Sequence, residues 1–239
     1  KWGHLVMYNH ENLMDIALSN GGKILSDDGK KVLINSKEWV DSWNFVRQQI
    51  FDNKTTKIES GGQGWEYWYR TIDNVMNGEA MSYTGSSGDK GDLDFTKISS
   101  LPQPGLNGNP GKPVANAHSL LVPAAASEEQ KKAAYEWIAY FTSPEVSAKW
   151  SEKIGYIPVR KSAADVAEYK KFIKENPYAG VPYEQAMHAS PAFIDPTDGK
   201  ITDALSIAAD KVELQNVDAK TALDEAAKTA QKALDDLNK

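Results

Sequence analysis

The end of the chain carries the strongest helical signal in the sequence. From about Asp218 onward, small apolar residues recur every three or four positions and share one helix face: Ala222, Leu223, Ala226, Ala227, Ala230, Ala233, Leu234 and Leu237. Alanine favours the helix, and its short side chain lets a neighbouring element approach closely. We therefore expect a tightly packed terminal helix, and an almost wholly helical region over residues 162–239.

The first fifty residues instead alternate strand and helix signals. Residues 2–7 predict a short buried strand, and Asn9 can cap the helix that follows it. Residues 23–34 predict a hairpin around an Asp-Gly turn. Asn35 and Glu38 form a capping-box pattern before a second helix. One stripe of that helix is expected in the core: Trp39, Trp43, Val46 and Ile50.

The middle of the chain continues this alternation of strand and helix signals and then becomes rich in glycine and proline. A helix is expected from Trp65 to about Met76, a strand over 80–83 and a loop over 84–88. Residues 89–116 hold many of the glycines and prolines, which marks a connection between units. Another strand is expected over 118–122. Strands alternating with helices, followed by a helix-rich end, indicate an α/β protein.

Composition excludes several classes of function. The 239 residues carry a net charge of −6 with both signs interspersed, so no basic face for nucleic acid or for an anionic membrane is indicated. No apolar run reaches the roughly 18–20 residues that span a bilayer. The chain begins at Lys1 inside a strand pattern without a signal sequence. We therefore expect the natural protein to have further residues upstream.

The sequence contains no recognisable motif for catalysis or for metal binding. The four histidines do not form a His-Glu-x-x-His pattern, and there is no cysteine to complete a zinc site. Residues 85–88 do not form a nucleophile elbow, and residues 88–94 read as a solvated turn rather than a calcium loop. We expect no catalytic residue, metal or cofactor, although a pair of carboxylates for glycoside hydrolysis stays open.

Three segments together resemble a known family. Residues 73–81 with the loop at 85–88 resemble the helix, strand and ligand loop of family 1 extracellular solute-binding proteins. Residues 133–145 with Trp150 resemble the helix pair of that family, and Gly155-Tyr156-Ile157-Pro158-Val159-Arg160 resembles its hinge strand. Within the family, the glycerol-3-phosphate-binding type is the most similar, through Lys153–Pro158 and Glu175-Asn176-Pro177.

This resemblance implies a periplasmic-binding-protein-like, two-lobed α/β fold that is incomplete in this chain and has a helix-rich C-terminus. It places residues 1–98 in the second lobe, 99–158 in the returning segment of the first lobe, and 159–239 in the second lobe again. It also implies the substrate-binding component of an ABC importer, which lies outside the cytoplasm, in the periplasm or on the cell surface as a lipoprotein.

Two kinds of residues are expected to contact the solute. The resemblance matches Tyr156 to the hinge tyrosine that contacts ligand, and Ser86 and Ser87 to the hydroxyls of the ligand loop. Aromatic faces suit sugar rings, and small polar groups beside chain breaks can bind sugar oxygens. Four residues of these types complete the candidate site: Trp2, Trp65, Asn116 and His118.

The resemblance departs from its pattern where a phosphate would bind. The arginine of the glycerol-phosphate type falls near Thr202, and Lys200 could replace it only as a point charge without a bidentate fork. The Gly-Gly before the strand at 118–122 is replaced by Asn116-Ala117. We therefore favour a neutral sugar or glycoside over glycerol phosphate as the solute.

The sequence thus predicts a protein that captures a sugar or similar small polar solute in a cleft and delivers it to permease subunits. It is expected to be monomeric at full length, and it is not expected to be an enzyme or to bind nucleic acid. Two alternatives stay open. One is an adhesion or scaffold module on the same fold, and the other is an enzyme that acts on glycans.

Overall fold

The computed structural model describes residues 1–237. The chain divides into two compact units, and each is assembled from separate stretches of sequence. Unit 1 contains residues 1–85, 103–114 and 188–239, and unit 2 contains residues 86–102 and 115–187. Residues 159–187 pack with the segment before them in unit 2.

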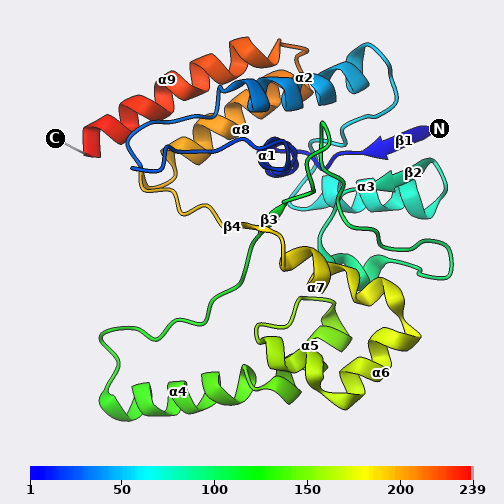
Figure 1. Ribbon diagram of the computed structural model, residues 1–239, viewed down its shortest axis with the longest axis vertical. Helices are drawn as coiled ribbons and strands as arrows, with labels where there is room; N and C mark the ends of the chain where they lie inside the picture. The colour runs from blue at the N-terminus through cyan, green and yellow to red at the C-terminus, as the bar shows by residue number, and fades with distance from the viewer. Residues whose placement is uncertain (238–239) are drawn as a thin grey trace. The chain divides into compact units, whose positions relative to one another are not determined.

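The sheet of unit 1 has two short parallel strands. β1 (Trp2–Leu5) pairs with β2 (Ala80–Tyr83), with Trp2 opposite Ala80 and His4 opposite Ser82. Parallel strands need a crossover connection. Here it contains α1 (His10–Ser19), α2 (Lys37–Phe51) and α3 (Glu66–Met76), and Figure 1 shows β1 and β2 side by side.

Three long helices supply most of the core of unit 1. α8 (Lys200–Glu213) and α9 (Ala219–Leu237) pack against each other and against α2, as Figure 1 shows. Trp39 and Trp43 of α2 are fully buried, and their indole nitrogens donate to the carbonyls of Lys23 and Leu13. Buried indoles without such acceptors would cost free energy. The predicted core stripe of this helix is therefore confirmed at Trp39, Trp43 and Val46.

The terminal helix α9 buries its small residues as the sequence predicts. Its buried side chains are Ala219, Ala222, Leu223, Ala226, Ala227, Ala230, Ala233 and Leu234. Alanines on the contact face let α8 and α9 approach closely, while each fully buried leucine contributes about 1.5–3 kcal/mol. The pair α8 and α9 thus forms a closely packed part of the core of unit 1.

One segment of unit 1 lies along α1 and is held by polar groups of that helix. Val114 N–H donates to Asp15 Oδ1 at 2.7 Å, and Lys112 N–H donates to Ser19 Oγ at 2.8 Å. Ser190 N–H donates to the Pro113 carbonyl, where β3 (Val114–Ala115) pairs with β4 (Ser190–Pro191). These bonds fix the chain next to the boundary between the units.

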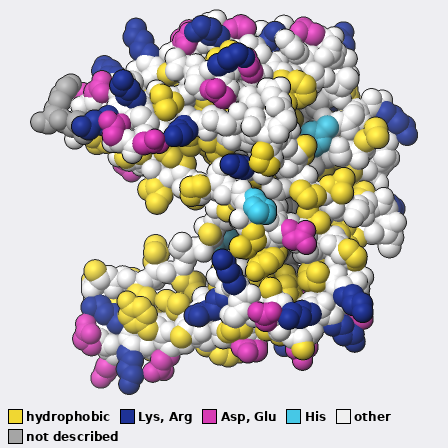
Figure 2. Space-filling view, viewed as in Figure 1, with side chains coloured by type: hydrophobic (Ala, Val, Ile, Leu, Met, Phe, Trp, Pro, Cys, Tyr) yellow, Lys and Arg dark blue, Asp and Glu magenta, His cyan; other side chains and the backbone are white. Residues whose placement is uncertain are grey.

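Unit 2 consists of short helices and loops. Its helices are η1 (Ser87–Asp92), α4 (Glu128–Phe141), α5 (Pro144–Ile154), η2 (Lys161–Asp165), α6 (Ala167–Glu175), η3 (Pro177–Ala179) and α7 (Val181–Ala186). Ser127 and Gln130 form the predicted capping box of α4, and Pro144 occupies the first turn of α5. In Figure 2 apolar side chains gather over α4, at the lower left of the view.

Several local predictions are wrong in detail. Residues 118–122 form no strand, because none of the described residues pairs with them. The predicted hairpin is reduced to a single bridge between Leu25 and Val32. Ser36, not Asn35, is the N-cap residue of α2; its side chain makes no capping bond to the backbone, and its hydroxyl donates to the Glu38 carboxylate instead. The region after 162 is also less helical than predicted, since residues 192–199 contain no helix.

Candidate functional site

The Ser86–Gly88 turn and Tyr156 lie against each other in unit 2. A Cβ atom at Gly88 would fall 2.7 Å from Tyr156 Cε1, so the tyrosine ring occupies the space that a side chain would need. Gly155 has φ 95°, and a Cβ there would lie 2.3 Å from the Ser87 carbonyl oxygen. Gly88 thus leaves room for the Tyr156 ring, and glycine is required at Gly155 because of its positive φ and the close Ser87 backbone. The structure thus brings Ser86, Ser87 and Tyr156 together, and their contact with a solute stays a prediction.

The serine turn is ordered by its own hydrogen bonds. Ser86 Oγ accepts from Gly88 N–H at 3.1 Å, and Asp89 Oδ2 accepts from Ser86 N–H at 3.0 Å, which forms a capping box at η1. Asp89 is buried, so the expectation of a solvated turn at residues 88–94 is wrong there. The carboxylate is instead a structural group that fixes the loop.

A small pocket of about 40 Å³ opens beside this turn. All residues that line it belong to unit 2. They are Ser86, Ser87, Lys90, Leu93, Phe95, Ser100, Ser151, Gly155, Tyr156, Ile157, Pro158, Tyr169, Phe172, Tyr178, Ala179, Pro182 and Tyr183. Aromatic rings and serine hydroxyls are the combination that suits a polar ligand with an apolar ring face.

The polar side chains of this pocket are mainly hydroxyls, with one lysine. Ser151 Oγ is buried and has no hydrogen-bond partner among the described residues, so it is available to a ligand or a water. Lys90 is the single charged lining residue in the described part of the chain. Its ammonium donates to the Glu152 carbonyl at 2.6 Å and lies 5.5 Å from the Phe172 ring centroid. The pocket therefore offers stacking faces and neutral donors.

Two further predicted residues belong to unit 2, and one of them, His118, contacts Tyr156. The His118 ring contacts the Tyr156 ring edge-to-face, with centroids 5.5 Å apart and planes at 65°. His118 is exposed, as is Asn116 two residues earlier. His118 thus extends the exposed surface around Tyr156.

The two predicted tryptophans belong to unit 1. Trp2 on β1 is half-buried, and Lys57 Nζ lies 5.9 Å from its ring centroid. Trp65 directly precedes α3 and is 65% exposed, as expected for a ring beside a glycine-rich loop. The candidate residues therefore divide between the units, with Trp2 and Trp65 in unit 1 and the other five in unit 2.

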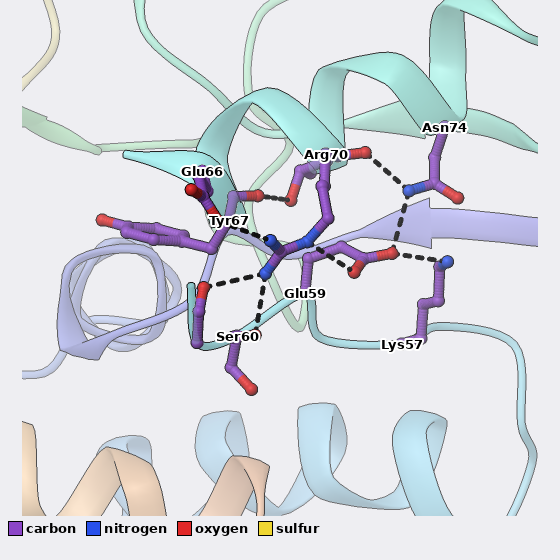
Figure 3. A network of polar contacts seen from close by, with 9 residues as sticks. Lys57, Glu59, Ser60, Glu66, Tyr67, Arg70 and Asn74 are labelled. Atoms are coloured by element: carbon purple, nitrogen blue, oxygen red, sulfur yellow. Dashed lines mark hydrogen bonds and ion pairs between the residues drawn. The ribbon is translucent and has the colours of Figure 1, made fainter. Parts of the chain in front are cut away.

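A polar network holds the glycine-rich loop before Trp65 against α3. Arg70 Nη2 donates to the carbonyls of Ser60 and Gly61, each at 2.8 Å, and Arg70 Nε lies 3.4 Å from Glu59 Oε2. Asn74 Nδ2 donates to Glu59 Oε1 at 2.9 Å. Figure 3 shows how the Arg70 side chain spans this loop next to Tyr67. The network fixes the backbone that leads into Trp65.

The position near Thr202, where the glycerol-phosphate type would have its arginine, lies in the first turn of α8. Thr202 N–H and hydroxyl both donate to Asp195 Oδ2, at 2.9 and 3.0 Å. Lys200 begins α8 and is exposed. Within residues 1–237 no group of three or more His, Asp or Glu side chains is placed to hold a metal ion, and no helix has the length and apolar character to cross a bilayer.

Sequence reasoning missed most of the pocket wall. Phe95 and Tyr178 stack with ring centroids 3.6 Å apart, although 83 positions separate them in the chain (178 − 95). Ser151, Tyr169 and Phe172 also line the pocket. Each lies in a helix or loop without a motif, so no local signal could have selected it.

Comparison with known proteins defines the family. The sequence profile described as bacterial extracellular solute-binding protein matches residues 1–177. The chain belongs to this family. Relatives of this chain include proteins described as the sn-glycerol-3-phosphate-binding periplasmic protein UgpB. That of Yersinia pestis is 29% identical over 82 residues, which cover 34% of this chain and 19% of the relative. That of Escherichia coli is 25% identical over 127 residues, which cover 51% and 29%.

Solved structures of solute-binding proteins share the fold. UgpB from Mycobacterium tuberculosis, in complex with glycerophosphocholine, matches with a TM-score of 0.81 and 21% identity, over 100% of this chain and 60% of that one. The sugar-binding protein MalE from Xanthomonas citri matches with a TM-score of 0.81 and 17% identity, over 100% and 59%. MalE from Bdellovibrio bacteriovorus, bound to maltotriose, matches with 0.76 and 21%, over 97% and 60%.

These matches confirm the predicted fold class. The chain has a helix-rich α/β fold of the periplasmic-binding-protein type, and it spans about 60% of the length of the solved structures that it resembles. Family and fold are those of transport solute-binding proteins rather than of enzymes, and the family is extracellular. The lobe assignment of residues 1–98, 99–158 and 159–239 stays a prediction.

Proposed function

We propose that this chain belongs to the substrate-binding component of an ABC importer that captures a neutral sugar or glycoside and delivers it to membrane permease subunits. The proposal places the protein outside the cytoplasm, either free in a periplasm or held by a lipid anchor. The observation that carries it is the contact between Tyr156 and the Ser86–Gly88 turn at the mouth of a pocket lined by rings and hydroxyls.

The chemistry of this pocket favours binding of a neutral polyhydroxylated ligand. Aromatic faces contact the C–H side of a sugar ring, and the hydroxyls of Ser86, Ser87 and Ser151 bind its oxygens. Lys90 is the single charged residue among the described lining residues, and the pocket offers a phosphate no bidentate arginine fork. Solved structures that share the fold bind maltotriose or glycerophosphocholine, which supports a small polar solute.

The same pocket disfavours the enzymatic alternative. Glycoside hydrolysis uses two carboxyl groups on either side of the scissile bond. None of the described residues that line this pocket is an aspartate or a glutamate. The arrangement therefore supports capture without chemical change of the solute.

Isothermal titration calorimetry with maltose, maltotriose and sn-glycerol 3-phosphate tests this proposal. We expect micromolar binding of a neutral sugar, about −8 kcal/mol, and weaker or no binding of the phosphate. Tyr156→Ala should weaken sugar binding about tenfold, since one aromatic contact contributes about 1 kcal/mol or more. Tyr135→Ala, which removes an exposed ring of α4, is the matched control and should bind as the wild type does.

Absence of binding by every sugar, together with tight binding of sn-glycerol 3-phosphate, would contradict the assignment of a neutral solute. Equal affinity of the wild type and of Tyr156→Ala would show that the Tyr156 pocket is not where the solute binds.

A further inference from the structure

One face of α8 holds the turn that leads from β1 into α1. The polar residues of that face follow one another at helical spacing and are Ser206, Asp210 and Glu213. The Tyr8 hydroxyl donates to Asp210 Oδ1 at 2.6 Å, and Asn9 N–H donates to Glu213 Oε2 at 3.2 Å. His10 Nδ1 lies 2.9 Å from Ser206 Oγ. Tyr8, Asn9 and His10, the clamped turn, are therefore each held by a polar group of α8.

Asn9, at the centre of the clamped turn, has a strained backbone. Its φ of 92° and ψ of 169° lie in a region that is essentially restricted to glycine. A residue with a Cβ keeps such a conformation only where its surroundings enforce it, and such residues gather at sites that switch between conformations. The Asn9 side chain also caps α1, because its Oδ1 accepts from His10 N–H at 2.7 Å. A backbone held against strain relaxes once the hold is lost.

Glu213 is the buried acid that holds Asn9. It is 2% exposed, and its Oε1 has no hydrogen-bond partner among the described residues. Burial raises the pKa of Glu213 well above its ordinary value of 4.5, the Asp210 charge acts in the same direction, and the Asn9 N–H bond opposes both. A neutral carboxyl can accept from Asn9 through Oε2 and carry its proton on Oε1. An ionised Glu213 would be a buried charge beside a second carboxylate, which is unfavourable.

The other titratable groups of this cluster keep their state as the solution becomes mildly alkaline. The bond to Asp210 is the largest cause that raises the pKa of Tyr8 to about 12, so the hydroxyl stays protonated. Burial lowers the pKa of His10, against the charges of two acids, Glu11 and Asp203. The elements packed against α8 bring charged groups that have partners of their own: Arg47 of α2 with Asn216, and Glu225 of α9 with Lys211. In mild alkali the change of charge around the clamped turn therefore falls on Glu213.

We propose that the clamped turn and α8 form a pH-sensitive latch, in which ionisation of Glu213 in alkaline solution draws its carboxylate toward water and frees Asn9 from its strained conformation. The neutral acid closes the latch. Its contribution to stability is complete below pH 4.5, the ordinary pKa, and is lost as pH rises through the pKa of Glu213 in the folded protein. Release of Asn9 also removes the cap of α1. The latch lies within unit 1 and does not depend on the proposed function.

Hydrogen exchange measured by mass spectrometry tests the latch on the purified protein between about pH 6 and pH 10, with rates corrected for the intrinsic effect of pH. The peptide covering residues 6–13 should lose protection about tenfold or more as pH rises, while peptides of α9 keep theirs. Glu213→Gln keeps an acceptor for Asn9 N–H and cannot ionise, so its turn should stay protected throughout. Glu79→Gln changes an exposed residue of unit 1 and should behave as the wild type does.

Asp15→Asn separates the latch from the other buried acid of α1. The latch predicts that the loss of protection at residues 6–13 persists in this variant. No loss at any pH in the wild type, a loss that persists in Glu213→Gln, or a loss that Asp15→Asn abolishes would each overturn the latch.

The strain at Asn9 has a test that leaves Glu213 in place. Asn9→Gly and Asn9→Ala both remove the side-chain cap of α1, and only Asn9→Ala keeps a Cβ in the glycine region. Asn9→Gly should therefore be the more stable, by about tenfold in the folding equilibrium constant, although glycine loses more chain entropy on folding. Urea denaturation measures the difference. Equal stability, or a more stable Asn9→Ala, would show that the turn stores no strain to release and would overturn the proposal.

Discussion

Helices α9 and α4 are both indicated by their sequence patterns, but α9 is packed in a core and α4 is exposed. α9 in unit 1 buries eight of its residues, whereas α4 in unit 2 buries none. On α4 the rings of Tyr135, Trp137 and Tyr140 are 64%, 56% and 61% exposed. Residue pattern favours a helix in both segments, but burial depends on a partner face. The part of the chain that the structure describes supplies that face to α9 and not to α4.

The largest effect is expected from a truncation in α9. Leu223 is fully buried, so Leu223→Ala should lower the free energy of unfolding by about 3 kcal/mol through lost burial and a cavity. Urea denaturation measures it. Leu237→Ala in the same helix removes a 56% exposed side chain and should stay within about 0.5 kcal/mol. Similar losses in the two variants would show that α9 is not packed as described.

A smaller loss of stability is expected in unit 2 at the contact between Gly155 and the Ser87 carbonyl. Gly155→Ala combines a left-handed backbone with a Cβ 2.3 Å from the Ser87 carbonyl, and should cost about 2–3 kcal/mol and weaken sugar binding. Gly78→Ala is the control, because its φ is 69° but nothing lies within 4 Å of the added Cβ. It should cost only about 1 kcal/mol. If both variants cost the same, the Ser87–Gly155 approach is not close in solution.

A pH dependence should appear in unit 1 at Asp15. Burial raises the pKa of Asp15 from 3.8 to about 7, against the lowering effect of the Val114 N–H bond. The folded state therefore binds more protons than the unfolded state between these values, and stability falls as pH rises through that window. Asp15→Asn keeps an acceptor for Val114, and should flatten this part of the stability curve by about 1 kcal/mol or more.

Glu213 must be considered in the same experiment. Burial also raises its pKa, so some dependence of the same sign remains in Asp15→Asn. Denaturation at several pH values compares the two slopes. A variant as steep as the wild type would show that Asp15 is ionised throughout.

The smallest effect is expected on α4. Tyr135→Ser removes an exposed ring and should change the free energy of unfolding by less than about 0.5 kcal/mol. Thermal unfolding with a parallel measurement of mass by light scattering checks this. A loss above about 1 kcal/mol would mean that the α4 face is covered in solution, and the contrast with α9 would fail.

The sequence predicted elements whose signals are local. Asn9 caps α1 with its side chain, and Ser127 and Gln130 cap α4, because caps depend on a few adjacent residues. Trp39 and Trp43 were predicted in the core from helical spacing alone. The strand expected over 118–122 is absent because a strand needs a partner, which composition cannot supply.

The candidate site was predictable only in part. Tyr156 and the serine turn were selected through a family resemblance, and the structure brings them together. The stacked pair Phe95 and Tyr178 was not selected, because residues far apart in the chain meet only after folding. Tyr67 was likewise not selected, since its ring contact with Tyr8 forms only after folding.

The central claim is that the solute contacts the Ser86–Gly88 turn and Tyr156. Amide resonances followed by nuclear magnetic resonance during titration with maltotriose test it most directly. The account predicts that the largest shifts fall on residues 86–88 and 155–157, with α9 unchanged. Saturable shifts confined to other residues, with those two segments unmoved, would contradict it.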